Sequence, residues 1–195
     1  MKKEDLKTDE FVILIDAAYL DETAGAMRYY FSPIIHRDLP KADVAAMLEG
    51  VALDAGIRPG NNQIDVILIY DRHTPALKNC QPSDLAEDLH SVAFQSSLGE
   101  FQFSAFSTEG MTSHEAMFAD FAGALSVSQG TKLVMLMGDV SSLGNEVVED
   151  MKKAKERTIC YFGMQARDEK DFPFAFHNLG FDLLHAMGVN PGELE

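Results

Sequence analysis

Three stretches of the chain are apolar at every position, and each ends just before or within two residues of an aspartate. They are residues 11–15 before Asp16, 66–70 before Asp71 and 133–137 before Asp139. An unbroken apolar run of this length is typical of a strand buried on both faces, as in a parallel sheet. In open α/β sheets, ligands bind outside the carboxyl ends of the strands. The pattern therefore predicts a buried sheet with a carboxylate-bearing edge at which function is expected.

Helical periodicity fills the segments between the apolar runs. Helices are expected over 22–31, 41–55, 84–97, 112–128, 143–156 and 174–187, with Thr112 and Glu115 forming a capping box. Two further strands are expected over 101–106, at an edge of the sheet, and over 158–162. The alternation of strands and helices indicates one α/β domain over residues 1–195, with three layers and a mostly parallel five-stranded sheet.

The two ends of the chain are expected to differ from the middle. Residues 1–10 are charged and are expected to form a flexible leader, while residues 172–195 are expected to form a C-terminal helical extension. Cys80 and Cys160 are too few for a disulfide framework, and Cys160 is expected to be a small core residue. The start lacks the features of a signal peptide and no segment approaches the length of a membrane span, so we expect a cytoplasmic protein that does not bind membranes.

The net charge of the 195-residue chain is −15. A surface this acidic repels phosphate backbones, so RNA binding is possible but disfavoured. The same charge suits a cluster of carboxylates that binds cations.

The aspartates that follow the apolar runs are the first candidates for chemistry. Asp16 and Asp139 are the strongest, Asp71 is similar, and the alternative for each is that it caps a helix or starts a turn. Asp120 has small or apolar helical neighbours and is expected to be partly buried, a costly position for a charge that has no partner. Glu115 could support it as a ligand, although a role as a helix cap is the alternative.

Several carboxylates with few basic residues between them suit Mg²⁺ or Mn²⁺. Such an ion could activate water and neutralise phosphate charge during phosphodiester hydrolysis. The chain has no glycine-rich nucleotide-binding motif and no nucleophile elbow. His114 is expected to be a solvated residue at a helix start.

At three points the chain resembles the NYN branch of the PIN-like nuclease superfamily. The first is the strand ending Ile15-Asp16, the second is the segment from His114 to Asp120, and the third is Gly138-Asp139 after a strand. The resemblance covers about residues 11–163. It implies a parallel sheet of order 3-2-1-4-5 and a divalent-metal ribonuclease site formed by Asp16, Asp120 and Asp139.

The chain departs from the family pattern at three positions. Tyr19 stands where the family has an asparagine, and His114 stands where it has the first helix carboxylate, with Glu115 beside it. Ser141 replaces the second aspartate of the Gly-Asp motif. Because of these replacements, the resemblance is better evidence for the fold than for the activity.

Two functions therefore remain open. The first is a degenerate PIN-like domain that acts through self-association or protein binding, as a homo-oligomer or through the aromatic segment 172–187. The second is a metal-dependent ribonuclease or phosphodiesterase in which Asp16, Asp120, Asp139 and Glu115 bind Mg²⁺ or Mn²⁺. In that alternative, Arg28 and Asp71 would contact the substrate.

Overall fold

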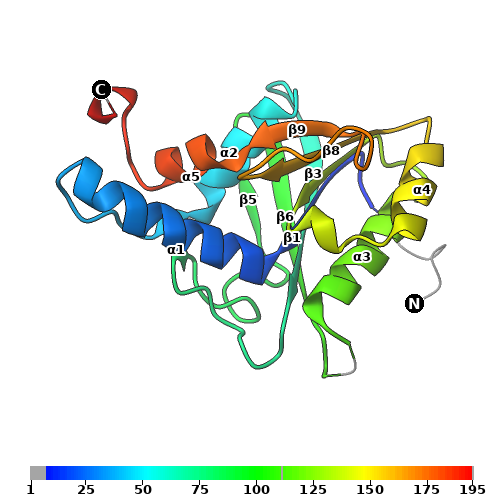
Figure 1. The fold of residues 1–195 in the computed structure, drawn as a ribbon, viewed down its shortest axis with the longest axis horizontal. Coiled ribbons are helices and arrows are strands. Elements are labelled where there is room, and N and C mark those ends of the chain that lie inside the picture. The colour runs from blue at the N-terminus through cyan, green and yellow to red at the C-terminus, as the bar shows by residue number, and fades with distance from the viewer. Residues whose placement is uncertain (1–7, 111, 195) are drawn as a thin grey trace.

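The computed structural model describes residues 8–110 and 112–194. Figure 1 shows a twisted sheet in the centre with helices packed around it. The helices are α1 (Ala17–Ile34), α2 (Val44–Asp54), α3 (His114–Leu125), α4 (Asn145–Lys153) and α5 (Leu179–Ala186), with short 3₁₀ helices η1 (Val140–Ser142) and η2 (Pro191–Glu193). The strands are β1 (Phe11–Asp16), β2 (Ala42–Asp43), β3 (Asn62–Tyr70), β4 (Cys80–Gln81), β5 (Ala93–Gln95), β6 (Gly99–Ser107), β7 (Leu133–Met137), β8 (Thr158–Gly163) and β9 (Ala175–Asn178).

The main sheet has seven strands in the order β5-β6-β3-β1-β7-β8-β9, and β2 and β4 form a small separate pair. All neighbours in the main sheet are parallel except β5 and β6, so the sheet is mixed. The expected α/β class is confirmed. The expected number of five strands is wrong, because β5 and β9 extend the sheet at its two edges.

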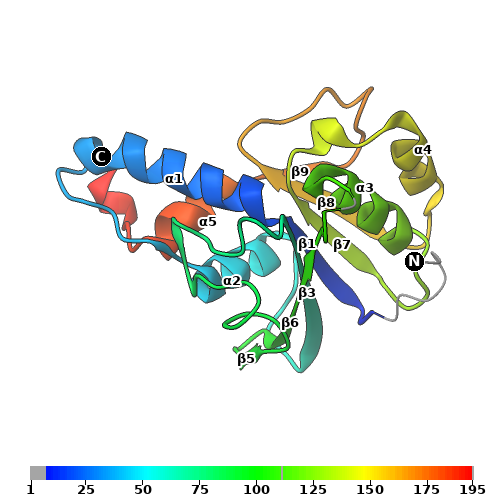
Figure 2. The same ribbon diagram turned by 90° about the horizontal axis from the view of Figure 1, so that it is seen from below.

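The helices cover both faces of the sheet. Figure 2 shows α1, α2 and α5 on one face, with α3 and α4 on the other. Within β1, Ile13 and Ile15 join the core under the first group of helices, while Val12 and Leu14 join the core under the second. Successive strand residues point to opposite faces, which explains why this strand is apolar at every position.

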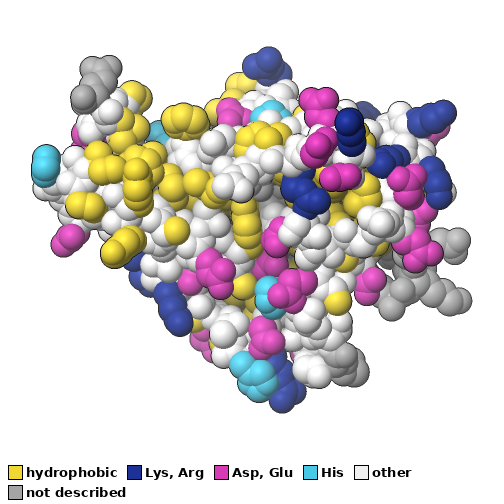
Figure 3. All heavy atoms as spheres, in the orientation of Figure 1, with side chains coloured by type: hydrophobic (Ala, Val, Ile, Leu, Met, Phe, Trp, Pro, Cys, Tyr) yellow, Lys and Arg dark blue, Asp and Glu magenta, His cyan; other side chains and the backbone are white. Residues whose placement is uncertain are grey.

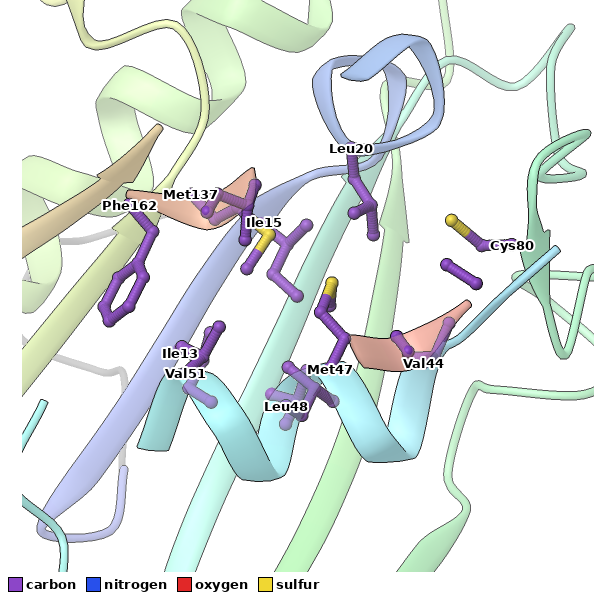
Figure 4. Close-up of a cluster of buried hydrophobic side chains, with 14 of the residues drawn as sticks. Ile13, Ile15, Leu20, Val44, Met47, Leu48, Val51, Cys80, Met137 and Phe162 are labelled. Carbon is purple, nitrogen blue, oxygen red and sulfur yellow. The ribbon is translucent and has the colours of Figure 1, made fainter. Parts of the chain in front are cut away.

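Figure 4 shows the larger of the two cores, where Ile15 and Met137 from the sheet face Met47 and Leu48 of α2. Cys80 belongs to the same core, and Cys160 is buried as expected. Burial raises the pKa of both thiols to about 12. Both cysteines are therefore neutral packing residues at ordinary pH.

The helix expected over 84–97 is absent. The structure has one isolated turn, in which Asp88 N–H donates to Asp84 C=O, and Ser91 then takes a positive φ of 60°. Leu85 and Leu89 are both buried, and their spacing of four residues imitates a helical stripe. Residues 93–95 instead form β5, where Phe94 stacks on Phe101 at 4.6 Å. Because β5 covers β6, the expectation that 101–106 is an edge strand is also wrong.

Most of the expected N-terminal leader, residues 1–7, lies outside the described residues. Residues 8–10 are anchored to the fold: the Thr8 hydroxyl bonds to that of Thr131 at 2.6 Å, and Asp9 N–H donates to Asp65 at 2.7 Å. Their polar groups are satisfied by the sheet and by the loop before β7.

Residues 172–194 are part of the fold's core. The segment supplies β9, which pairs in parallel with β8, and then α5, which packs against α2. The final helix begins five residues later than the expected 174, because residues 175–178 pair with the sheet. Among the residues that the structure describes, no helix is both long and apolar enough to cross a membrane.

Candidate functional site

Asp16 ends the central strand β1 and begins α1. Its Oδ1 accepts hydrogen bonds from the backbone N–H groups of Ala18 and Tyr19, at 3.0 and 3.3 Å. This carboxylate is therefore the N-cap of α1, as the alternative explanation for a strand-end aspartate requires. The residue is only 3% exposed, so its second oxygen also needs a partner.

His114 provides that partner. Its Nδ1 lies 3.0 Å from Oδ2 of Asp16, and its Nε2 lies 3.2 Å from Oε1 of Glu115. His114 is the first residue of α3, and Ser113 caps this helix by accepting a hydrogen bond from Ala116 N–H. The expected Thr112 cap is therefore replaced by Ser113. An imidazole between two carboxylates satisfies both of them only when both ring nitrogens carry protons.

Glu115 lies at the first turn of α3 with its side chain about half exposed. A hydrogen bond with Ser113 is the main cause that lowers the pKa of this carboxyl, and its own backbone N–H adds to the effect. The nearby charge of Asp139 acts in the opposite direction. Glu115 and Asp139 therefore influence each other electrostatically.

Asp139 follows β7 by two residues and is exposed. Its Oδ1 accepts hydrogen bonds from the backbone N–H of Ser141, at 2.9 Å, and from the Ser141 hydroxyl, so it caps the 3₁₀ helix η1. With Tyr19 and Ser141 it lines a pocket of about 310 Å³. Burial raises the pKa of Tyr19, and the charge of Asp139 contributes to the increase.

The two expected substrate-binding residues make other contacts. Asp71 follows β3, accepts a 2.7 Å hydrogen bond from His73 N–H, and lines a separate pocket of about 160 Å³. Arg28 lies twelve residues into α1 from the Asp16 cap, where it donates to Leu39 C=O and to Asn79 Oδ1, both at 3.0 Å. Arg28 therefore joins α1 to the segments beside it and is not at the carboxyl edge.

Asp120, the third carboxylate of the expected metal site, lies six residues after His114 on α3. The expectation that it is partly buried is wrong, because the residue is exposed. The side of α3 that packs on the sheet carries Phe118, Phe121 and Leu125 at helical spacing. The small residues three and four positions from Asp120 on the helix therefore do not show that Asp120 faces the core.

The structure thus brings together Asp16, His114, Glu115 and Asp139, which we call the edge cluster. Within residues 8–110 and 112–194, no group of three or more His, Cys, Asp or Glu side chains is arranged to hold a metal ion. Both oxygens of Asp16 already have protein partners. The residues present therefore do not fit the Mg²⁺ or Mn²⁺ site that the resemblance implies.

His114 is the residue that sequence reasoning missed. It was expected to be solvated, yet its side chain is three-quarters buried between two carboxylates. The available indication was its position, because it stands where the resembling family has a carboxylate. An imidazole in that place gives Asp16 and Glu115 a nitrogen neighbour where the family pattern has a further carboxylate.

Comparisons with known proteins find a match at the level of family only. No curated protein and no solved structure matches the chain. A family model matches residues 5–194, which is almost the full length. The chain therefore belongs to DUF6621, a family of unknown function.

Proposed function

We propose that the chain is a PIN-like domain that does not use metal-dependent catalysis and that works by self-association. The observation that carries the first half is the edge cluster, in which His114 lies 3.0 Å from Asp16 and 3.2 Å from Glu115. The imidazole lies between the two carboxylates, where a divalent ion would bind in a metal-dependent nuclease. Its two ring nitrogens give these carboxylates polar neighbours without a metal.

The order of the strands supports the PIN-like part of the proposal. The five strands expected from the sequence are β1, β3, β6, β7 and β8 in chain order. In the sheet these five strands lie in the order β6-β3-β1-β7-β8, which is 3-2-1-4-5 when they are numbered along the chain. β5 and β9 extend the two edges. The resemblance implies this order for the five strands.

The second half of the proposal is carried by the outer surface of α1. Between Thr23 and Ile34 the only charged residue is Arg28, and its side chain is bonded to the protein. Tyr29 is 87% exposed and Tyr30 is 64% exposed on the same helix. A helix surface with large apolar residues and no free charge is typical of an interaction site.

A neighbouring helix extends this surface. On α5, Phe181 is 70% exposed, and Ile34 is also exposed at the end of α1. Figure 3 shows hydrophobic side chains gathered over the part of the molecule where α1 and α5 lie in Figure 1. We call Tyr29, Tyr30, Ile34 and Phe181 the α1–α5 face.

The partner that we propose for this face is a second copy of the chain. Two chains of net charge −15 repel each other over most of their surfaces. The α1–α5 face consists of uncharged side chains, so a two-fold contact that pairs it with itself joins the copies where repulsion is weakest. Burial of the aromatic side chains then supplies the favourable free energy.

Light scattering across a range of micromolar concentrations tests the proposal. We expect the wild type to form a dimer and the double variant Tyr30→Glu, Ile34→Glu to be a monomer. The matched control is Val127→Glu, which adds a charge at another exposed apolar position and should remain a dimer. A monomeric wild type, or an equal effect of Val127→Glu, would contradict self-association through this face.

A second candidate is a nuclease that requires Mg²⁺ or Mn²⁺. It is favoured by one observation, namely that Asp16, Glu115 and Asp139 meet at the same edge of the sheet. Calorimetric titration of Mn²⁺ into the wild type and into Asp139→Asn separates the two candidates. Binding that the variant loses would favour the nuclease, while the absence of binding by the wild type would rule out this metal site.

A further inference from the structure

A pocket of about 390 Å³ lies between α4 and the loop that joins β8 to β9. Three basic side chains line it: Lys152 from α4, and Arg167 and Lys170 from the loop. The chain has only 16 lysines and arginines against 31 aspartates and glutamates. Three cations around one pocket are therefore a local reversal of the charge of the molecule.

Two carboxylates also line the pocket, and one of them is already paired. Glu149 forms an ion pair with Lys152, with 2.9 Å between Oε1 and Nζ. The second carboxylate is Asp171, which follows Lys170 in the loop. The three cations exceed these two carboxylates by one charge. Figure 3 shows Lys and Arg side chains grouped, with acidic ones among them, on the side where Figure 1 places α4. The pocket is therefore a place where an anion is attracted within an otherwise repulsive surface.

Arg167 is the most informative of the three. Its Nη1 is buried and has no hydrogen-bond partner among the described residues. Its backbone N–H donates to the hydroxyl of Tyr161, a buried residue of β8, so the residue is held close to the sheet. A buried guanidinium N–H without an acceptor is costly, and a turn of the Arg167 side chain towards an anion in the pocket would remove this cost.

The pocket continues towards the edge cluster. Arg167 and Val140 also line the neighbouring pocket that contains Tyr19, Asp139 and Ser141. A ligand that places an anionic group beside Arg167 could thus direct a neutral polar part towards the hydroxyl groups of Tyr19 and Ser141. Pockets of a few hundred Å³ suit a small molecule.

We propose that the pocket formed by Lys152, Arg167 and Lys170 binds the phosphate group of a small phosphorylated molecule. The forked guanidinium of Arg167 and two flexible ammonium groups match the several oxygens and the double charge of a phosphate. A long polyanion such as RNA is disfavoured, because it would have to cross the acidic surface around the pocket. This site is separate from the α1–α5 face and does not depend on self-association.

The test is calorimetric titration of inorganic phosphate and inorganic pyrophosphate at constant ionic strength. We expect the wild type to bind at least one of them, and Arg167→Gln and Lys170→Gln each to weaken the affinity by about tenfold. Lys170 is exposed, so Lys170→Gln keeps the test informative if Arg167→Gln does not fold. The matched control is Lys132→Gln, which removes an exposed lysine at the opposite ends of the strands and should bind as the wild type does.

Three results would overturn the proposal. The first is no binding of either probe at millimolar concentration by the wild type, and the second is equal affinity in the wild type and in Lys170→Gln. The third is tighter binding of a single-stranded RNA than of pyrophosphate, with the RNA affinity reduced in Lys170→Gln. That result would assign the basic residues to a nucleic acid.

Discussion

At the scale of single residues, Asp182 of α5 is the most unusual carboxylate of the fold. It is only 7% exposed, and its Oδ2 has no hydrogen-bond partner within the described part of the chain. Its Oδ1 lies so close to Gly50 of α2 that a Cβ at residue 50 would collide with it. Burial, with a contribution from the charge of Asp54, raises the pKa of Asp182 to about 7.

This pKa predicts that stability depends on pH. The pKa of Asp182 is higher in the folded chain than in the unfolded chain, so folding takes up a proton between the two values. The stability contributed by the neutral carboxyl is fully present below about pH 4 and is lost as the pH rises through about 7. We expect Asp182→Asn to be more stable than the wild type at pH 8 by about 2 kcal/mol, and the difference to shrink towards pH 5.

Urea unfolding of both proteins at pH 5 and pH 8 measures the effect. The control is Asp120→Asn, which removes an exposed carboxylate from α3 and should shift stability equally at the two pH values. A wild type that is as stable at pH 8 as the Asp182→Asn variant would show that burial does not raise the pKa of Asp182.

At the scale of elements, the junction of β3 and β6 depends on a glycine. Gly99 begins β6 opposite Asn62, the first residue of β3, and has a φ of +140°. A Cβ at this position would collide with the backbone of Asn62. This close approach explains why the long pairing of β3 with β6 can begin at these residues.

We expect Gly99→Ala to destabilise the fold by about 1–3 kcal/mol, because alanine disfavours this φ and has no room beside Asn62. Thermal unfolding followed by circular dichroism measures the loss. Gly192→Ala provides the comparison, since nothing lies within 4 Å of the corresponding Cβ and its stability should hardly change. Similar unfolding temperatures for the two variants would disprove the role given to Gly99.

The elements that the sequence predicted well are those with a single strong cause. The apolar runs of β1, β3 and β7 had to be buried on both faces, and their strands end within one or two residues of the expected aspartates. The segment 84–97 was misread because Leu85 and Leu89 are buried by contacts of an irregular loop, which sequence spacing cannot distinguish from a helix. β9 was missed because its pairing with β8 is decided by residues distant in the sequence.

The candidate site was predictable only in outline. The carboxyl edge of the sheet and the aspartates Asp16 and Asp139 followed from the strand pattern. The role of His114 did not, because a contact between the start of α3 and the end of β1 joins residues 98 positions apart. Arg167 was not singled out, since its burial depends on how the loop after β8 folds back.

At the scale of the whole molecule, net charge should control self-association. Each copy carries a charge of −15, so the copies repel each other at low ionic strength. Raising NaCl from about 50 to about 500 mM should tighten the dimer by about fivefold to tenfold, because salt screens this repulsion and strengthens apolar contacts.

Sedimentation equilibrium at the two salt concentrations measures this change. The Tyr30→Glu, Ile34→Glu variant should remain a monomer in both conditions, because the apolar contacts of its interface are gone and salt cannot restore them. A dimer that dissociates as salt is added would instead indicate contacts between opposite charges, and would contradict an apolar interface.

The position of α5 has a consequence for synthesis of the chain. Gly50 of α2 lies against Asp182 of α5, which is made more than 130 residues later. While a ribosome is still translating the intervening strands, the side of α2 that packs on α5 has no cover. The core of the nascent chain therefore stays incomplete until residues 179–187 have left the exit tunnel. Until then, the uncovered side of α2 is accessible to chaperones and prone to aggregation.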